Sequence, residues 1–106
     1  MFYAYKILMP LERLKRLNTK ESLWLYVISV LKDRPMHAYV LRTEIEEKFG
    51  FSTGNVTVYK VLYLLQREGY VTKQKEGRRV IYSITEKGIK ALDEAKGFYK
   101  KQVDRL

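Results

Sequence analysis

The residues of this chain that could carry chemistry are cations and neutral hydrogen-bond donors, because nucleophiles and metal ligands are scarce. The sequence has no cysteine and a single histidine, His37, which excludes disulfides, thiol nucleophiles and cysteine zinc sites. It contains no GxGxxG or GxxxxGK stretch of the kind that holds phosphates. The acidic group Glu44, Glu46 and Glu47 is typical of a solvated helix turn. We therefore expect no enzymatic activity, no cofactor and no metal, with His37 at a helix start or packed locally.

Positive charge is concentrated in parts of the chain. The 106 residues include 21 Lys and Arg against 12 Asp and Glu, a formal net charge of +9. Residues 52–84 carry six basic and two acidic side chains and residues 1–20 carry five and one, whereas residues 21–51 are slightly acidic. Chance unevenness is one alternative, but regional basicity favours a face that binds a polyanion, most commonly nucleic acid and less often an acidic membrane surface. We expect no membrane span and no secretory signal, and hence a cytoplasmic protein.

Apolar spacing predicts a short N-terminal helix followed by three further helices in the first two thirds of the chain. Residues 11–17 suggest a short amphipathic helix, and Asn18 with Glu21 resembles a capping box that starts the next one. Its expected buried face is Trp24, Val27, Ile28 and Leu31, and it ends before Pro35. A second helix is expected from about His37 to Phe49, with Gly50 as its left-handed cap. The third is expected to be capped by Ser52 or Thr53, to bury Val58, Val61, Leu62 and Leu65, and to end at Gly69.

The spacing of apolar residues changes from a helical to a strand-like pattern after the third helix. Residues 70–84 are rich in β-branched residues and tyrosine, and Glu76-Gly77 interrupts them, which predicts a β-hairpin. Its tip is strongly basic, with Lys73, Lys75, Arg78 and Arg79 within seven residues. Charged turns are common, but this position after three helices favours a winged helix-turn-helix whose wing contacts DNA.

The last helix is expected to start at a Thr85 cap. Its apolar face is wider than one edge of a small domain could cover. Its apolar seam follows alternating steps of three and four residues, which indicates a homodimer contact. The seam comprises Ile89, Leu92, Lys96, Tyr99, Val103 and Leu106.

The outward side of the third helix carries donors suited to a major groove. The expected DNA-binding residues at and near this helix are Ser52, Thr53, Asn55, Val56, Thr57, Tyr59, Lys60 and Tyr63. Packing of Tyr59 and Tyr63 on neighbouring helices is the alternative. The predicted class is therefore α+β and mainly helical. The winged helix-turn-helix spans residues 18–84, residues 1–17 form an amphipathic N-terminal arm or short helix, and residues 85–106 form a C-terminal dimerisation helix.

Residues 31–92 resemble the winged-helix domain of the phenolic acid decarboxylase regulator (PadR) family. The resemblance is carried by His37-Ala38-Tyr39, Thr57-Val58-Tyr59, Glu68-Gly69-Tyr70-Val71 and the run from Tyr82 to Gly88. Lys60 stands where the family usually has proline, and residues 52–56 form a longer entry to the helix, so base preference does not transfer.

The resemblance implies a DNA-binding homodimer that most often represses transcription, in some members in response to small aromatic or cationic compounds. A small-molecule effector would then lie at the dimer interface or against the aromatic arm of Phe2, Tyr3 and Tyr5. The leading hypothesis is thus a sequence-specific regulator on a pseudo-palindromic operator. The alternatives are a non-specific architectural DNA-binding protein and a winged-helix module that binds an acidic protein.

Overall fold

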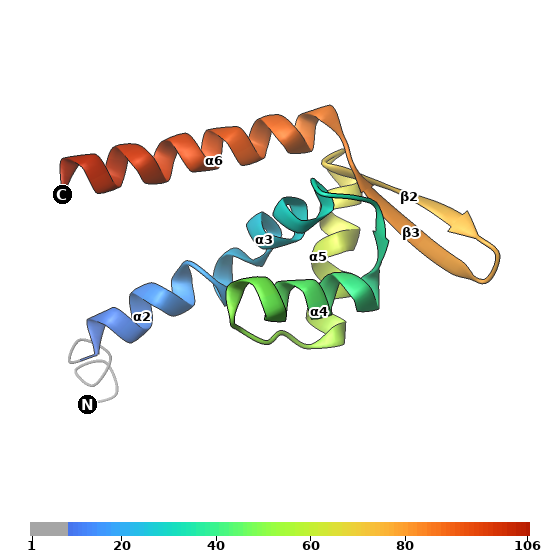
Figure 1. The fold of residues 1–106 in the computed structure, drawn as a ribbon, viewed down its shortest axis with the longest axis horizontal. Helices are drawn as coiled ribbons and strands as arrows, with labels where there is room; N and C mark the ends of the chain where they lie inside the picture. Colours follow the sequence, from blue (N-terminus) through green and yellow to red (C-terminus); the bar gives the residue numbers. More distant parts are fainter. Residues whose placement is uncertain (1–8) are drawn as a thin grey trace.

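The computed structural model of this protein describes residues 9–106 (Figure 1), so Phe2, Tyr3 and Tyr5 lie outside the described residues. The described chain is mainly helical with one small antiparallel sheet, which confirms the predicted α+β class and the winged helix-turn-helix order. The elements are α2 (Pro10–Leu17), the 3-10 turn η1 (Lys20–Ser22), α3 (Leu23–Leu31), β1 (Met36–His37), α4 (Ala38–Phe49), α5 (Asn55–Arg67), β2 (Val71–Glu76), β3 (Arg79–Ile84) and α6 (Glu86–Arg105). None of these helices is long and apolar enough to cross a membrane.

The sheet contains one strand that the sequence did not reveal. Its order is β1-β3-β2, and the two-residue β1 pairs Met36 with Tyr82 and His37 with Ile81. A two-residue strand is too short to show an alternation of apolar and polar residues, so it leaves no signal in the sequence. The preceding Pro35 indicates only that a helix has ended. The hairpin turn is also one residue later than expected, at Gly77 and Arg78, because Glu76 already pairs with Arg79. Gly77 has a φ of 66°, a conformation that glycine adopts without steric cost.

Two predicted helix caps are wrong and three are confirmed. Asn18 does not start α3; it follows α2, where its side-chain amide donates to the Leu14 carbonyl at 2.9 Å. Neither Ser52 nor Thr53 caps α5, whose N-cap is Gly54, and residues 51–54 have no regular secondary structure. Gly50 and Gly69 have φ values of 74° and 86° at the ends of α4 and α5, and the Thr85 hydroxyl accepts from the Gly88 amide at 3.1 Å.

The core lies where α3, α4 and α5 meet the base of the sheet. It includes Val27, Ile28, Leu41 and Leu62, which are fully buried. Trp24 was expected in this core but is 38% exposed. The buried side of α3 uses Leu23 and Val30 instead, so Trp24 faces the space between α3 and α6.

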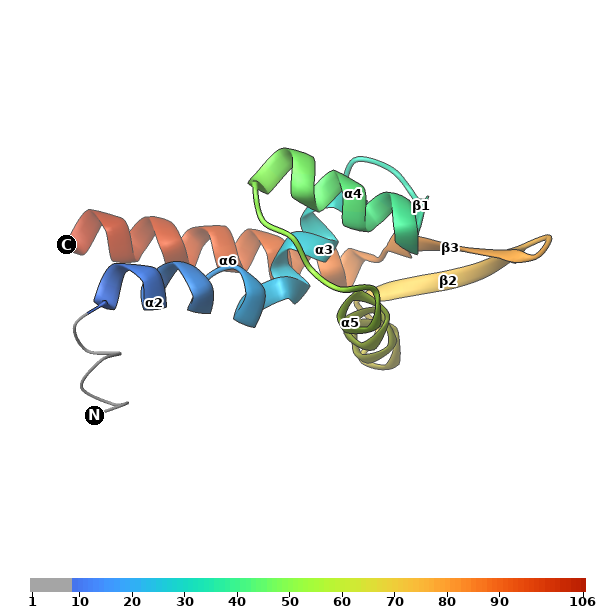
Figure 2. The ribbon, with the colours of Figure 1, turned by 90° about the horizontal axis from the view of Figure 1, so that it is seen from below.

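Helix α6 joins the core only through its first half. Gly88 and Leu92 are buried there, whereas residues 100–106 are all exposed. Both α2 and α6 extend from the core in one direction and the β2–β3 hairpin extends in the other (Figures 1 and 2), which gives the molecule a long axis of 51 Å. The Tyr99 hydroxyl donates to Asn18 Oδ1 at 2.9 Å and so links α6 to the end of α2.

Candidate nucleic-acid interface

Helix α5 separates its side chains into an inner and an outer face. Val58, Leu62 and Leu65 are buried. The outer side chains are exposed, including Val56 at 82%, and Tyr59 and Tyr63 are both more than half exposed, so neither is buried against a neighbouring helix. The exposed residues of α5 that the sequence predicted are Asn55, Val56, Thr57, Tyr59, Lys60 and Tyr63.

Two predicted residues lie off this helix. Ser52 is exposed and Thr53 is half-buried, and both belong to the irregular segment, residues 51–54, that leads into α5. They are therefore placed at its N-terminal approach rather than on its outer face.

The basic residues at the hairpin tip are all exposed. The strand register places Lys73 opposite Tyr82 and Lys75 opposite Val80, so both lysines share the sheet face of the buried Tyr82. Arg78 lies in the turn and Arg79 begins β3. Together with the exposed residues of α5 listed above, Lys73, Lys75, Arg78 and Arg79 make up what we call the recognition face.

A cleft of about 380 Å³ lies between α5, the hairpin and the start of α4. It is lined by Tyr59 from α5, Arg78 and Arg79 from the hairpin, and Tyr39 from the first turn of α4, with His37, Ala38, Val80 and Tyr82. Burial raises the pKa of the Tyr82 hydroxyl above its usual value and the neighbouring Tyr59 adds to the shift, so this hydroxyl stays protonated at neutral pH. Tyr39 was missed as a site residue because its neighbours in sequence predict only a helix start.

The predicted dimer seam on α6 is divided between the core of this chain and solvent. Leu92 is 2% exposed in the core, so it is not available to a partner, and Tyr99 is half-buried against Asn18. Spacing along one helix predicts an apolar stripe but does not show which of its residues another element of the same chain covers. Ile89, Lys96, Val103 and Leu106 are exposed.

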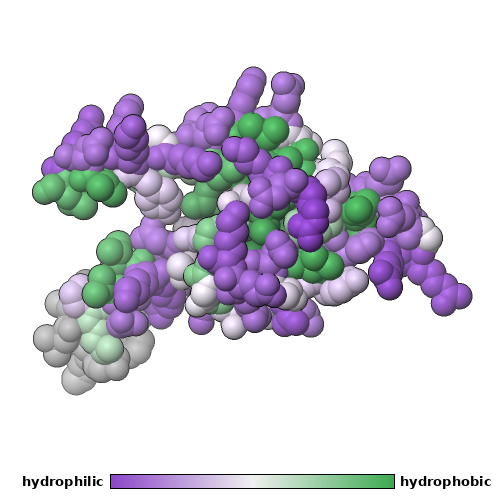
Figure 3. Space-filling model, viewed as in Figure 1, coloured by the Kyte–Doolittle hydropathy of each residue, from purple (hydrophilic) through white to green (hydrophobic). Residues whose placement is uncertain are grey.

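Further apolar side chains lie uncovered on α6 and on α2. They are Phe98 on α6 and Leu11, Leu14 and Leu17 on α2. Figure 3 shows hydrophobic side chains gathered at the projecting ends of the two helices. We call α2 and residues 96–106 of α6 the projecting arms.

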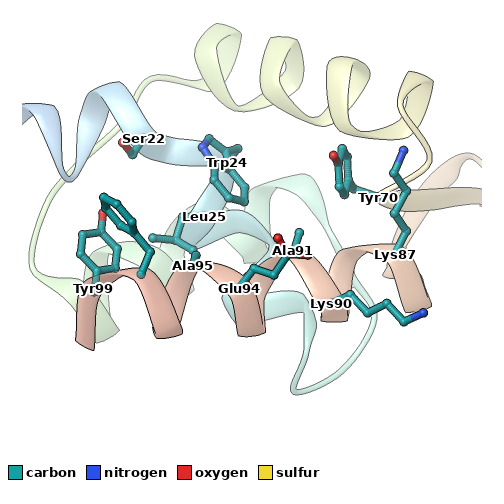
Figure 4. A pocket seen from close by; sticks show the side chains of 11 residues that line it. Ser22, Trp24, Leu25, Tyr70, Lys87, Lys90, Ala91, Glu94, Ala95 and Tyr99 are labelled. Atoms are coloured by element: carbon teal, nitrogen blue, oxygen red, sulfur yellow. The ribbon is translucent and has the colours of Figure 1, made fainter. Parts of the chain in front are cut away.

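A second cavity, of about 570 Å³, lies between α3 and α6. Trp24 and Leu25 from α3 face Ala95 and Tyr99 from α6 across it, and Lys87 lies beside Tyr70 at its end (Figure 4). The Lys87 Nζ is 4.5 Å from the centre of the Tyr70 ring and donates to the Glu68 carbonyl at 2.6 Å. Lys87 is thereby held at the C-terminal end of α5. Within residues 9–106, no three His, Asp or Glu side chains converge as metal ligands.

Similar proteins were found by family model and by structure. A search of the curated proteins found no match. The structure of a PadR family transcriptional regulator from Eggerthella lenta has a TM-score of 0.76 at 22% identity, over 96% of this chain and 91% of that one. A transcriptional regulator from Clostridium thermocellum has a TM-score of 0.71 at 21% identity, over 82% of this chain and 91% of that one.

Bacillus subtilis PadR, whose structure is a complex with operator DNA, matches with a TM-score of 0.60 at 22% identity over 68% of this chain and 45% of that one. The model of the transcriptional regulator PadR-like family matches residues 27–94, which run from α3 into the first half of α6. The chain therefore belongs to the PadR-like family of transcriptional regulators.

Proposed function

We propose that this protein is a sequence-specific DNA-binding regulator that represses transcription as a homodimer on a pseudo-palindromic operator. The observation that carries the proposal is the shared cleft, because Tyr59 of α5 and Arg78 and Arg79 of the hairpin line the same space. The outer face of α5 and the basic tip are thus presented to one side of the molecule, where a single duplex can contact both.

Each part of the recognition face suits a different part of the duplex. Asn55 and Lys60 offer side-chain donors near the start of α5, where a helix entering the major groove reaches base edges, and the exposed Val56 can contact a thymine methyl. The arginines of the hairpin tip suit phosphates and the adjacent minor groove. Bacillus subtilis PadR, a related fold, was solved in complex with operator DNA, which supports duplex DNA as the partner.

A second copy of this chain is the partner we propose for the projecting arms. Val103 is 68% exposed and Leu106 is fully exposed, so the apolar stripe of α6 continues past the cover that α3 provides. A two-fold pair of such chains would place two α5 helices about one turn of B-DNA, roughly 34 Å, apart. In this proposal residues 18–84 bind DNA, residues 85–106 pair the chains, residues 1–17 support the pairing, and the protein works in the cytoplasm.

The cavity between α3 and α6 is where we propose that a small-molecule effector binds. Its aromatic side chains suit a planar ring, and it borders the part of α6 that would face the second copy. Trp24 is the single tryptophan and lines the cavity, so titration of its fluorescence with a planar aromatic cation and with an aromatic carboxylate tests the site. An unchanged Trp24 signal with both probes would contradict it.

Selection of bound duplexes from a random pool, followed by competition with bulk genomic DNA, tests the main proposal. We expect an enriched motif with two inverted half-sites, and a preference of about 10³ or more over random duplex. Binding without enrichment would instead identify an architectural protein. Failure to bind any duplex at low salt would favour a module that binds an acidic protein.

A further inference from the structure

We propose that the cleft between the start of α4, helix α5 and the hairpin is the seat of one backbone phosphate of bound DNA, and that Tyr39 is a donor to that phosphate. This inference rests on the proposed function, since it requires that the chain binds duplex DNA. It adds a contact from α4, an element that the predicted interface did not include.

The cleft exists because β1 is shorter than the strand it pairs with. The β1–β3 ladder ends at the pair His37 and Ile81, so the edge of β3 toward the hairpin tip has no strand beside it. The chain turns into α4 directly after His37, which places Tyr39 over that open edge. Tyr59 closes the cleft from the side of α5, and Val80 and Tyr82 form its apolar part.

The ring of Tyr39 is held in place although it is 56% exposed. It stacks on His37 with ring centres 6.0 Å apart and planes 3° from parallel. The His37 ring is fixed in turn, because its Nδ1 donates to the Val80 carbonyl at 3.0 Å. The orientation of Tyr39 therefore depends on the backbone of β3 rather than on solvent.

The hydroxyl of Tyr39 is arranged to donate. Arg79 Nη1 lies 3.5 Å from the Tyr39 oxygen and donates to it. The phenolic oxygen thus serves as an acceptor, which leaves its own hydrogen for another acceptor. A phosphate oxygen in the cleft would accept from this hydroxyl and from the guanidinium groups of Arg79 and Arg78.

The charge of the cleft fits a phosphodiester. Among the described residues, neither Arg78 nor Arg79 forms an ion pair with a carboxylate. The nearby Glu76 instead has its Oε1 3.7 Å from His37 Nε2. Two guanidinium groups and a fixed neutral donor are the groups that position a DNA backbone without reading its sequence.

The test uses Tyr39→Phe, which keeps the stack on His37 and removes only the hydroxyl. With a duplex taken from the selection experiment, we expect affinity to fall roughly tenfold or more, as for other hydrogen bonds to a charged group. The salt dependence should be unchanged because a neutral donor releases no counterion, whereas Arg79→Gln should make the slope of log K against log salt shallower by about one. Thr43→Val is the control, since it removes another exposed hydroxyl of α4, one that donates to the Tyr39 carbonyl and lies outside this cleft, and it should bind as the wild type does.

Single methylphosphonate substitutions along the duplex locate the phosphate. At one position in each half-site, removal of the phosphate charge should weaken the wild-type protein while the affinity difference between wild type and Tyr39→Phe disappears. Equal affinities of wild type and Tyr39→Phe, or a difference that persists at every methylphosphonate, would overturn the phosphate seat. A wild-type protein that binds no duplex would overturn the proposed function itself.

Discussion

The recognition face and the projecting arms are both uncovered in this chain, but they expose different chemistry. The recognition face presents cations, hydroxyls and an amide, mounted on α5 and a hairpin whose inner sides are buried in the core. The projecting arms present leucine, phenylalanine and valine side chains on helices that extend beyond the core.

This difference indicates two different partners. Exposed cations are favourably hydrated in water, and when they contact DNA they release the counterions condensed on its phosphates. Exposed apolar side chains are stabilised only when another apolar surface covers them. The recognition face therefore suits DNA and the projecting arms suit protein, and each prediction below tests whether the two regions act separately.

The largest expected effect is on DNA affinity, when cations of the recognition face are removed and compared with cations of the projecting arms. Replacing Arg78 and Arg79 by Ala removes two phosphate contacts, so affinity for any duplex should fall about 100-fold near 0.1 M salt, with the slope of log K against log salt shallower by about two. Fluorescence anisotropy over a salt series measures both quantities. The control is Lys100→Ala with Lys101→Ala, which removes the same charge from exposed positions on α6. Equal losses in the two variants would mean that only net charge matters.

A smaller effect is expected when charge enters the projecting arms. Val103→Asp places a carboxylate in the exposed apolar stripe of α6 and should weaken self-association about 30-fold, as for a central interface residue. Sedimentation velocity at several concentrations measures the dissociation constant. Gln102→Asp adds the same charge one residue away and should leave it nearly unchanged. A Val103→Asp variant that dimerises like the wild type would move the interface off this end of α6.

The third effect concerns the α5 side of the recognition face. Asn55→Ala removes a neutral donor and should weaken binding to the selected operator roughly tenfold, with little change for random duplex, because base contacts discriminate by about 1–3 kcal/mol. Gln74→Ala removes an exposed amide from the hairpin and serves as control. Lys60→Ala should likewise change base preference in a repeated selection. Loss of affinity for both duplexes with Asn55→Ala would place this residue on the phosphate backbone instead.

The smallest effect distinguishes the packed half of α6 from its projecting half. A Cβ at Gly97 would meet nothing within 4 Å, so Gly97→Ala should raise the free energy of unfolding by about 0.5–1 kcal/mol through helix propensity. A Cβ at Gly88 would lie 2.5 Å from the Tyr70 carbonyl oxygen and 2.7 Å from Ile84 Cγ1, so Gly88→Ala should destabilise the fold. Urea unfolding measures both. A destabilising Gly97→Ala would show that a second copy packs closely at that position.

Much of the fold was predictable because local signals and burial agree. The αL caps at Gly50 and Gly69, the Thr85 cap and the buried stripe of α5 each depend on a few neighbouring residues. The failures arose where nearby residues compete. Ser52 and Thr53 are good caps in isolation, yet α5 begins only after Gly54. Trp24 is left out of the core, where α3 buries Leu23 and Val30 instead.

The candidate site was predicted in its parts but not in its assembly. The exposure of Tyr59, Lys60 and the four basic hairpin residues followed from helical phase and from turn position. The role of Tyr39 did not, because it depends on β1 ending at His37 and on a side chain of α4 lying over the edge of β3.

By itself, the sequence determined the helical stripes, the hairpin, the regional positive charge and the membership of the PadR-like family, because these follow from residue type and spacing along the chain. Only the tertiary structure decided that Leu92 belongs to the core of the chain, that Trp24 faces a cavity, and that Tyr39, Tyr59 and Arg79 share one cleft. The physical reason is that an apolar stripe or a charged side chain acquires its partner only when elements distant in sequence pack together. A side chain that the chain's own fold covers is no longer available to DNA or to a second chain.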